Sequence, residues 1–224
     1  YGYMNRGVRE GYCGVCVYHY SNDQNVVEEK VFIPSTESYE FLKKDLGTLS
    51  YVSTDNSLFL LFAQKLYRIN ITDGKNEVLD QDIRTEDFSV SDTGAHAAWV
   101  IQNGENAGYI KEIDFETLET RTLAPSQGQT LVLNGFMNED LVYGIVVDGD
   151  TVSDANGHET TGIHTIRIEG FDGTVKKEYN QEGLYITDVT MGNTMMEFEL
   201  SKKTKKGYKA VSKDNILNNS KASA

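Results

Sequence analysis

The chain has 224 residues, 39% of them hydrophobic, which is enough for one large domain or two small ones. No run approaches 18 apolar residues, so no membrane-spanning helix is predicted. The net charge of −13 is uneven: residues 201–224 carry a net of +6, which leaves −19 on residues 1–200. Because an acidic body repels phosphate backbones, we expect no nucleic-acid partner.

The first predicted element is a β-hairpin. Residues 12–20 and 26–33 are rich in β-prone side chains, and the polar loop 21–25 joins them. Pro34 is predicted to end the second strand, because proline cannot donate a hydrogen bond to a ladder.

A short helix is predicted over residues 37–46. Leu42 and Leu46 fall near helical spacing, and either Thr36 or Ser35 is expected to cap its start. Gly47 suits the residue that follows a helix end. We expect this helix to pack across the rim of the neighbouring sheets.

From residue 49 onward a strand–turn–strand cassette recurs about every 37 to 54 residues, which is typical of a propeller or another repeat array. Continuous apolar runs at 58–62 and 97–101 predict strands buried on both faces. Asp-Gly pairs such as Asp172-Gly173 supply the positive φ that tight hairpins need. The cassettes cover residues 49–82, 88–123 and 131–179 in full, and 184–217 in part.

The clearest cassette reads Phe-Ser-Val-Ser-Asp-Thr-Gly-Ala-His-Ala-Ala-Trp-Val over residues 88–100, followed by an outer hairpin at 110–123. These residues resemble a blade of the TolB-type, WD-like β-propellers. That family places a Ser-x-Asp-Gly turn before the second strand and a Thr-Gly turn in the outer hairpin. In this chain Thr93 stands between Asp92 and Gly94, and Leu118 replaces the usual glycine.

We therefore expect an all-β fold: a β-propeller-like stack of four-stranded antiparallel sheets with one short helix, and a β-sandwich as the alternative. The expected parts are an N-terminal hairpin or partial blade (1–34), a helix and connector (35–47), blades at 48–84, 85–125 and 126–181, a loop insertion at 148–162 in the third of these, a partial blade (182–217) and a polar tail (218–224).

Cys13 and Cys16 have the spacing of a redox or zinc pair. They lie inside a β-prone run, where residues three apart point to opposite faces. A zinc site would also need a second pair of ligands. We interpret both as unpaired structural cysteines.

The acidic stretch 148–159 is the densest group of oxygen ligands in the chain. Asp148, Asp150, Asp154 and Asn156 partly fit the alternation of a calcium loop, but Val152 occupies a position that needs a ligand. A blade-edge loop without a metal is the alternative interpretation. Calcium is the one cofactor that the sequence suggests.

No catalytic residue is assigned. The histidines are scattered, and none has a partner at metal or triad spacing. No G-x-S-x-G elbow and no glycine-rich phosphate loop is present. Ser91, Asp92 and Trp99 are spaced wrongly for the Asp-box of sialidase-type propellers, so Trp99 is expected to pack between sheets. The four histidines are His19, His96, His158 and His164.

Two surface features are open to more than one interpretation. The lysine-rich segment 201–207 falls where a hairpin turn is expected, and it is either a solvated turn or a contact for an anionic surface. Tyrosines crowd the start of the chain, where they suit strands and binding surfaces alike. They are Tyr1, Tyr3, Tyr12, Tyr18 and Tyr20.

The resemblance implies a non-catalytic binding or scaffold module outside the cytoplasm of a bacterium: periplasmic, on the cell surface or secreted. We expect it to contact a protein or glycan through blade-edge loops. The alternative is a propeller-type enzyme or enzyme-gating domain that acts on glycosides or peptides. The chain begins with Tyr1 and not Met, so we interpret it as a piece of a longer protein, with membrane contact only through flanks that it lacks.

Overall fold

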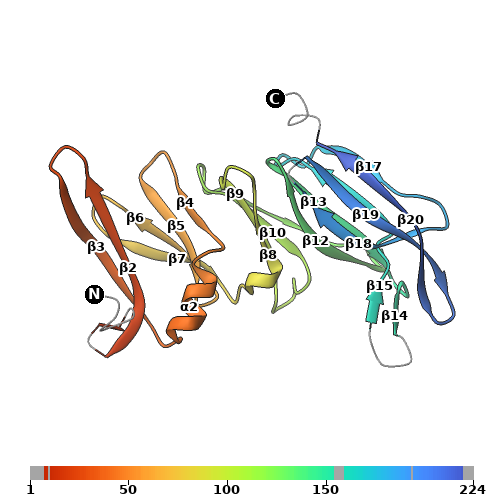
Figure 1. Cartoon of the computed structure of the whole chain (residues 1–224), viewed down its shortest axis with the longest axis horizontal. Coiled ribbons are helices and arrows are strands. Elements are labelled where there is room, and N and C mark those ends of the chain that lie inside the picture. Colours follow the sequence, from red (N-terminus) through yellow and green to blue (C-terminus); the bar gives the residue numbers. More distant parts are fainter. Residues whose placement is uncertain (1–7, 10, 154–158, 193, 219–224) are drawn as a thin grey trace. The chain divides into compact units, whose positions relative to one another are not determined.

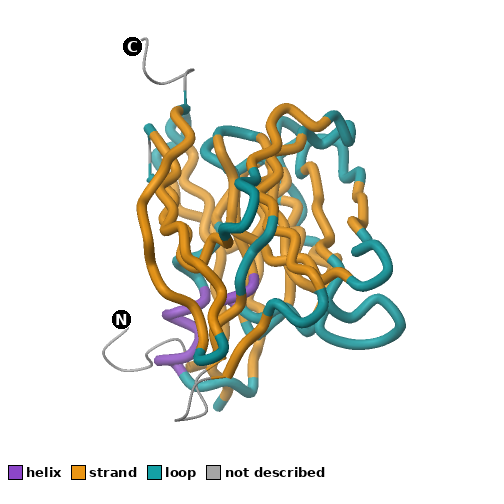
Figure 2. The backbone as a smooth tube through the Cα atoms, turned by 90° about the vertical axis from the view of Figure 1, so that its right-hand side faces the viewer, coloured by secondary structure: helices purple, strands orange, loops and turns teal. Residues whose placement is uncertain are grey.

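The computed structural model describes residues 8–9, 11–153, 159–192 and 194–218. The chain divides into two compact units, residues 1–86 with 115–118 and residues 87–114 with 119–224. Antiparallel strands make up most of the described backbone, and the helical segments are short (Figure 1; Figure 2). The all-β class predicted from the sequence is confirmed.

The first unit begins with a three-stranded antiparallel sheet in the order β1-β2-β3. The expectation that Pro34 ends the second strand is wrong, because Pro34 pairs with Gly14 inside the ladder and the strand continues to Ser35. Since β3 is an edge strand, a residue without an N–H can occupy it without breaking the sheet. The strands are β1 (Val8–Arg9), β2 (Tyr12–Ser21) and β3 (Val26–Ser35).

The single α-helix of the described residues is α2 (Tyr39–Asp45), which starts two residues later than predicted. Its N-cap is Ser38 and not Thr36 or Ser35. The Ser38 hydroxyl accepts a hydrogen bond from a backbone N–H of the first turn at 3.3 Å. Leu42 is buried, and the helix contacts β2 and β5.

A four-stranded antiparallel meander, β4-β5-β6-β7, completes the first unit. Its strands are β4 (Ser50–Val52), β5 (Ser57–Phe62), β6 (Lys65–Asn70) and β7 (Asn76–Gln81). The apolar run of β5 is almost entirely buried, as a strand covered on both faces should be. The core between this sheet, α2 and the β2–β3 hairpin consists of Val15, Ile33, Leu42, Leu60, Phe62, Tyr67 and Ile69.

The second unit contains two further four-stranded meanders, β8-β9-β10-β11 and β12-β13-β16-β17. Residues Thr85–Asp87 form a short 3-10 helix, η1, just before β8. The strands are β8 (Phe88–Val90), β9 (His96–Val100), β10 (Ile110–Asp114), β11 (Thr120–Leu123), β12 (Gln129–Met137), β13 (Asp140–Val147), β16 (Thr165–Glu169) and β17 (Val175–Tyr179).

A small hairpin interrupts the second of these meanders, and a three-stranded sheet, β18-β19-β20, follows it. The hairpin pairs β14 (Thr151–Ser153) with β15 (Glu159–Thr161) between β13 and β16. The last sheet consists of β18 (Tyr185–Met191), β19 (Met195–Thr204) and β20 (Gly207–Leu217). Lys205 and Lys206 of the lysine-rich segment form the turn between β19 and β20, while residues 201–204 belong to β19.

Within the second unit the first strands of the three sheets, β8, β12 and β18, lie beside one another. Gly135 of β12 sits where they meet. A Cβ at this position would lie 3.3 Å from Ser89 Oγ and 3.7 Å from Met191 Cγ. Apolar side chains fill the space between neighbouring sheets. One cluster joins β9 and β10 to β12 and β13, and another joins β13 and β16 to β18, β19 and β20.

The predicted glycine turns adopt the backbone that glycine favours, since Gly74, Gly94 and Gly173 have φ of 73°, 84° and 80°. Leu118 has φ of 62°, although it carries a branched side chain. This is the position where the TolB-type motif has glycine. The chain therefore keeps the motif's left-handed turn without the residue that favours it.

Candidate functional site

The outward face of the β2–β3 hairpin carries exposed aromatic and aliphatic side chains. Side chains alternate along a strand, so Val15 enters the core while Tyr12, Tyr18 and Tyr20 point the other way. Val27 lies opposite Tyr20 in the ladder. These four residues, called the tyrosine face below, are 59%, 58%, 51% and 63% exposed in the order Tyr12, Tyr18, Tyr20 and Val27.

Hydrogen bonds within the hairpin hold two of these tyrosines. Tyr18 Oη donates to Glu29 Oε2 at 3.2 Å, and Tyr20 Oη donates to Asn25 Oδ1 at 2.7 Å. The neighbouring Cys16 thiol and the Glu29 carboxylate raise the pKa of Tyr18 to about 12, so its hydroxyl stays neutral at ordinary pH. Both hydroxyls bond within the hairpin, so the rings of Tyr18 and Tyr20 expose mainly apolar surface.

Among the described residues Cys13 and Cys16 form no disulfide, and their interpretation as structural cysteines stays a prediction. Cys13 packs against the core of the first unit beside Val15. Cys16 lies on the other face, near Tyr18. Because the two side chains leave the strand on opposite sides, they do not form a redox or zinc pair.

The most perturbed ionisable groups form a network in the second unit, between β10–β11 and β13–β16. Arg121 Nε donates to Glu112 Oε2 and Arg121 Nη1 donates to Glu169 Oε1, both at 2.6 Å. Tyr143 Oη donates to Glu169 Oε2 at 2.6 Å, and Arg167 Nη1 donates to Tyr143 Oη at 3.4 Å. One arginine thus bridges two carboxylates from neighbouring sheets.

Burial dominates the electrostatics of this network. It raises the pKa of Glu112 to about 7, although the Arg121 guanidinium opposes the shift. Burial and the Glu169 carboxylate raise the pKa of Tyr143 to about 12. Glu112 Oε1 and Arg121 Nη2 are buried without a hydrogen-bond partner. The network therefore holds Glu112 close to the point at which it gains or loses a proton near neutral pH.

A cavity of about 220 Å³ lies beside the network, but Glu112 does not line it. Glu112 has no exposed surface, and a catalytic acid must reach the proton that it transfers. A near-neutral pKa alone does not make a catalytic group. The cavity is lined by Leu123, Ala124, Ser126, Gln129, Leu131, Tyr143, Ile145, Arg167 and Glu169.

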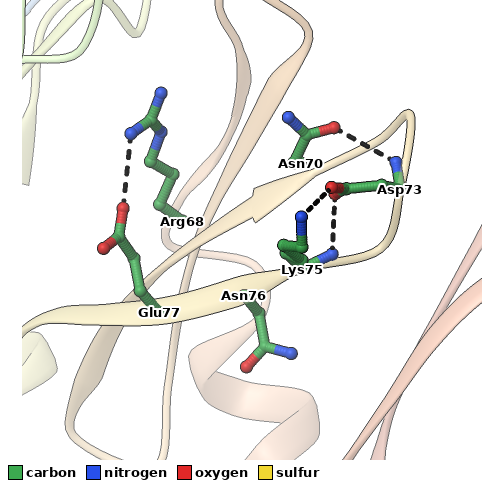
Figure 3. Close-up of a pocket in the computed structure, with 6 residues that line it drawn as sticks. All are labelled: Arg68, Asn70, Asp73, Lys75, Asn76 and Glu77. Carbon is green, nitrogen blue, oxygen red and sulfur yellow. Dashed lines mark hydrogen bonds and ion pairs between the residues drawn. The ribbon is translucent and has the colours of Figure 1, made fainter.

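A second hollow, of about 400 Å³, follows the β6–β7 hairpin of the first unit (Figure 3). Asn70 Oδ1 accepts the backbone N–H of Asp73 at 3.2 Å, and Asp73 pairs with Lys75 at 2.8 Å. Arg68 Nη1 contacts Glu77 Oε1 at 3.3 Å. Five of the six lining side chains are therefore already bonded to neighbouring residues of the hairpin.

Half of the predicted calcium ligands lie in the described part of the chain. Asp154 and Asn156 are outside the described residues, while Asp148 and Asp150 are within them. Asp150 Oδ1 accepts a 2.7 Å bond from Lys203 Nζ, which also donates to the Gly149 carbonyl. Among the described residues no three His, Cys, Asp or Glu side chains gather into a metal site. The calcium loop stays a prediction.

The contact of Lys203 with Asp150 gives this lysine a structural role. Tyr208 Oη donates to the Asp150 carbonyl at 2.9 Å and joins β20 to the same loop. Lys205 and Lys206, at the tip of the hairpin, are exposed. The segment therefore combines a solvated tip with one lysine that anchors the acidic loop.

The described histidines do not assemble with a nucleophile. His19 is exposed opposite Glu28, His164 Nδ1 lies 3.0 Å from Thr165 Oγ1, and His96 Nδ1 is buried without a partner. His158 lies outside the described residues. Trp99 is 3% exposed and stacks on Phe88 at 6.1 Å between ring centroids.

No family model matches this chain, and no curated protein matches it. Several solved structures are similar in fold. An oligogalacturonate lyase in complex with manganese is 10% identical over 88% of this chain and 58% of its own, with a TM-score of 0.39. TolB from Acinetobacter baumannii is 12% identical over 90% of this chain and 48% of its own, with a TM-score of 0.38. This chain spans about half the length of these two proteins.

A putative TolB from Agrobacterium tumefaciens is 10% identical over 88% of each chain, with a TM-score of 0.33. TolB proteins are among the solved structures to which this chain is similar. In the described residues no helix has the length and apolar character needed to cross a membrane.

Local sequence patterns do not indicate the ionic network, and they indicate only part of the tyrosine face. Arg121 and Glu169 are 48 residues apart, and only the packing of two sheets brings them together. Tyr18 and Tyr20 suit strands and binding surfaces alike, and their alternation with the apolar Val15 and Val17 indicates that they face outward. That alternation was the available signal.

Proposed function

We propose that this chain is a non-catalytic binding module that acts outside the cytoplasm and contacts a partner protein through the tyrosine face. The observation that carries the proposal is the exposure of Tyr12, Tyr18, Tyr20 and Val27 on one side of the β2–β3 hairpin. Large apolar side chains gathered on one exposed face are typical of interaction sites. Tyrosine is enriched among the residues that contribute most to binding energy.

Two details favour a protein over a glycan as the partner. The face mixes an aliphatic side chain, Val27, with aromatic rings, as the cores of protein interfaces do. A sugar site needs polar groups that converge on the ligand, whereas the hydroxyls of Tyr18 and Tyr20 are bonded within the hairpin. The proposed contact thus lies on a strand face and not on the blade-edge loops expected from the sequence.

The enzymatic alternative has less support. The most perturbed carboxyl group, Glu112, is fully buried and bound to Arg121, so a substrate does not reach it without rearrangement of the sheets. A glycoside- or peptide-active site needs an accessible acid or nucleophile beside a cleft. Among the residues that line the cavity beside the network, the carboxylate of Glu169 is already held by Arg121 and Tyr143.

The proposal is tested by site-specific photo-crosslinking in the full-length protein in its own cells. A photoreactive aromatic residue replaces Tyr20, and the control carries it at Val175, an exposed position on β17. We expect a discrete polypeptide adduct from position 20 that position 175 does not give. Equal adducts from both positions, or an adduct that contains carbohydrate and no peptide, would contradict the proposal.

A further inference from the structure

A third cavity, of about 420 Å³, lies in the second unit between β12, β18 and the β14–β15 hairpin. An antiparallel bridge between Ile163 and Ile186 fixes the base of the hairpin beside β18, with N–H···O distances of 2.8 and 2.9 Å. The volume falls in the range of small-ligand sites. The lining residues are Val132, Asn134, Glu159, Thr160, Thr161, Ile163, Thr187, Asp188 and Val189.

Two β-bulges direct side chains into this cavity. The β12–β13 register shifts between Leu133 and Gly135, which leaves Asn134 as the extra residue. The β18–β19 register shifts between Ile186 and Asp188, which leaves Thr187 as the extra residue. Bulges redirect side chains and occur often beside functional sites. Both extra residues line the same cavity, although they belong to different sheets.

The polar side of the cavity is rich in hydrogen-bond acceptors. Asn134 Oδ1 is buried without a hydrogen-bond partner, a state that destabilises a folded protein. Glu159 and Asp188 contribute carboxylates to the lining. Asp188 also lies directly opposite Glu199 in the β18–β19 ladder, and like charges facing each other destabilise a sheet. A bound cation with N–H donors would relieve both costs.

The remaining wall is apolar. Val132, Ile163 and Val189 line the cavity together with the acceptors, and its volume is far larger than a bare metal ion needs. The second unit carries 20 Asp and Glu against 12 Lys and Arg, a net charge of −8, which attracts cations towards it. A ligand with a cationic nitrogen head and an aliphatic stem matches both parts of the lining.

We propose that this cavity binds an alkylammonium or alkylguanidinium group, supplied by a basic side chain of a polypeptide or by a free small amine. Asp188 and Glu159 pair with the charged head, and Asn134 and Thr187 order it. Val132, Ile163 and Val189 cover the aliphatic stem. The site lies in the second unit and the tyrosine face in the first, so either proposal can fail without the other.

The test is a titration of the whole isotopically labelled chain, followed by its backbone amide NMR signals at low ionic strength. The probes are n-butylammonium, N-acetyl-lysine amide and, as a neutral isostere, N-acetyl-norleucine amide. We expect both amines to shift the amides of residues 132–134, 159–161 and 187–189, with a Kd of about 1 mM. The norleucine probe should shift none of them.

The double variant Glu159→Gln/Asp188→Asn should raise the Kd of both amines about ten-fold, as expected for the loss of two partly exposed ion pairs. Glu197→Gln is the matched control, because it removes one carboxylate from an exposed position of the adjacent strand β19. Dispersed amide spectra of both variants would show that they are folded.

Binding of N-acetyl-lysine amide without n-butylammonium supports a polypeptide side chain as the source, and binding of both supports a free amine as well. Three outcomes would overturn the proposal. They are no shifts with either amine, equal binding of the norleucine probe, and unchanged Kd in the double variant. Displacement of both amines by equimolar calcium would also overturn the proposal, because the cavity would then bind an inorganic cation.

Discussion

Replacing the buried carboxylic acid Glu112 with glutamine should make the second unit more stable at alkaline pH. The folded protein raises the pKa of Glu112 from 4.5 to about 7. The folded state therefore holds this proton more tightly than the unfolded state does, and the free energy of unfolding falls as pH rises from about 4.5 to above 7. At 1.36 kcal/mol per pKa unit the total loss is about 3 kcal/mol.

Glutamine keeps the shape of the side chain and still accepts the hydrogen bond from Arg121, but it does not ionise. Glu112→Gln should therefore match the wild type near pH 5 and exceed its free energy of unfolding by about 3 kcal/mol near pH 8.5. The assay is urea unfolding followed by fluorescence of Trp99, the one tryptophan of the chain. Trp99 pairs with Lys111, the residue next to Glu112, across β9 and β10, so it reports on this part of the molecule.

Glu182→Gln is the control, because it removes the same charge from an exposed turn between β17 and β18. Its stability difference from the wild type should not change between pH 5 and pH 8.5. Other ionisable groups contribute equally to wild type and variant, so they cancel in the difference. A Glu112→Gln difference that is constant across this range, or a variant less stable at pH 8.5, would refute the burial argument.

Two further predictions concern backbone space and the acidic loop. Gly74→Ala should lower hydrogen-exchange protection of β6 and β7 about 30-fold or more, because its Cβ would lie 2.2 Å from the Lys30 carbonyl oxygen at a φ of 73°. Gly11→Ala, with φ of 86° and nothing within 4 Å, should cost only about 1 kcal/mol, a roughly five-fold loss of protection in β2, and equal losses in the two variants would show that the missing space at Gly74 does not matter. Lys203→Met should lower the free energy of unfolding of the second unit by about 2 kcal/mol in the Trp99 assay, because it leaves Asp150 largely buried without its ammonium partner. A loss below about 0.5 kcal/mol would show that the contact does not anchor the loop.

Local sequence signals predicted the strands and turns well, because they depend on neighbouring residues. The apolar run of β5 is a strand buried on both faces, and Gly74 and Gly173 occupy the left-handed turns expected of them. The predicted helix start is too early, since Ser35, Thr36 and Ser38 all suit an N-cap and Ser38 is the residue that caps the helix.

The ionic contacts could not be predicted from the sequence, because each joins residues from different structural elements. No local pattern links Arg121 to Glu169, or Lys203 to Asp150 across 53 residues. The bulge at Asn134 could not be predicted from the sequence either. A strand with one extra residue looks like any other strand until its partner's register is known.

The tyrosine face is expected to bind a protein. Once the polypeptide crosslinked at position 20 is identified, its Kd for the wild type and for Tyr18→Ala/Tyr20→Ala tests the claim most directly. Removing an energetically dominant tyrosine costs about 2 kcal/mol or more, so the double variant should bind at least about 30-fold more weakly, while Tyr18→Phe/Tyr20→Phe should stay within about three-fold. An unchanged Kd in the alanine variant would contradict the account.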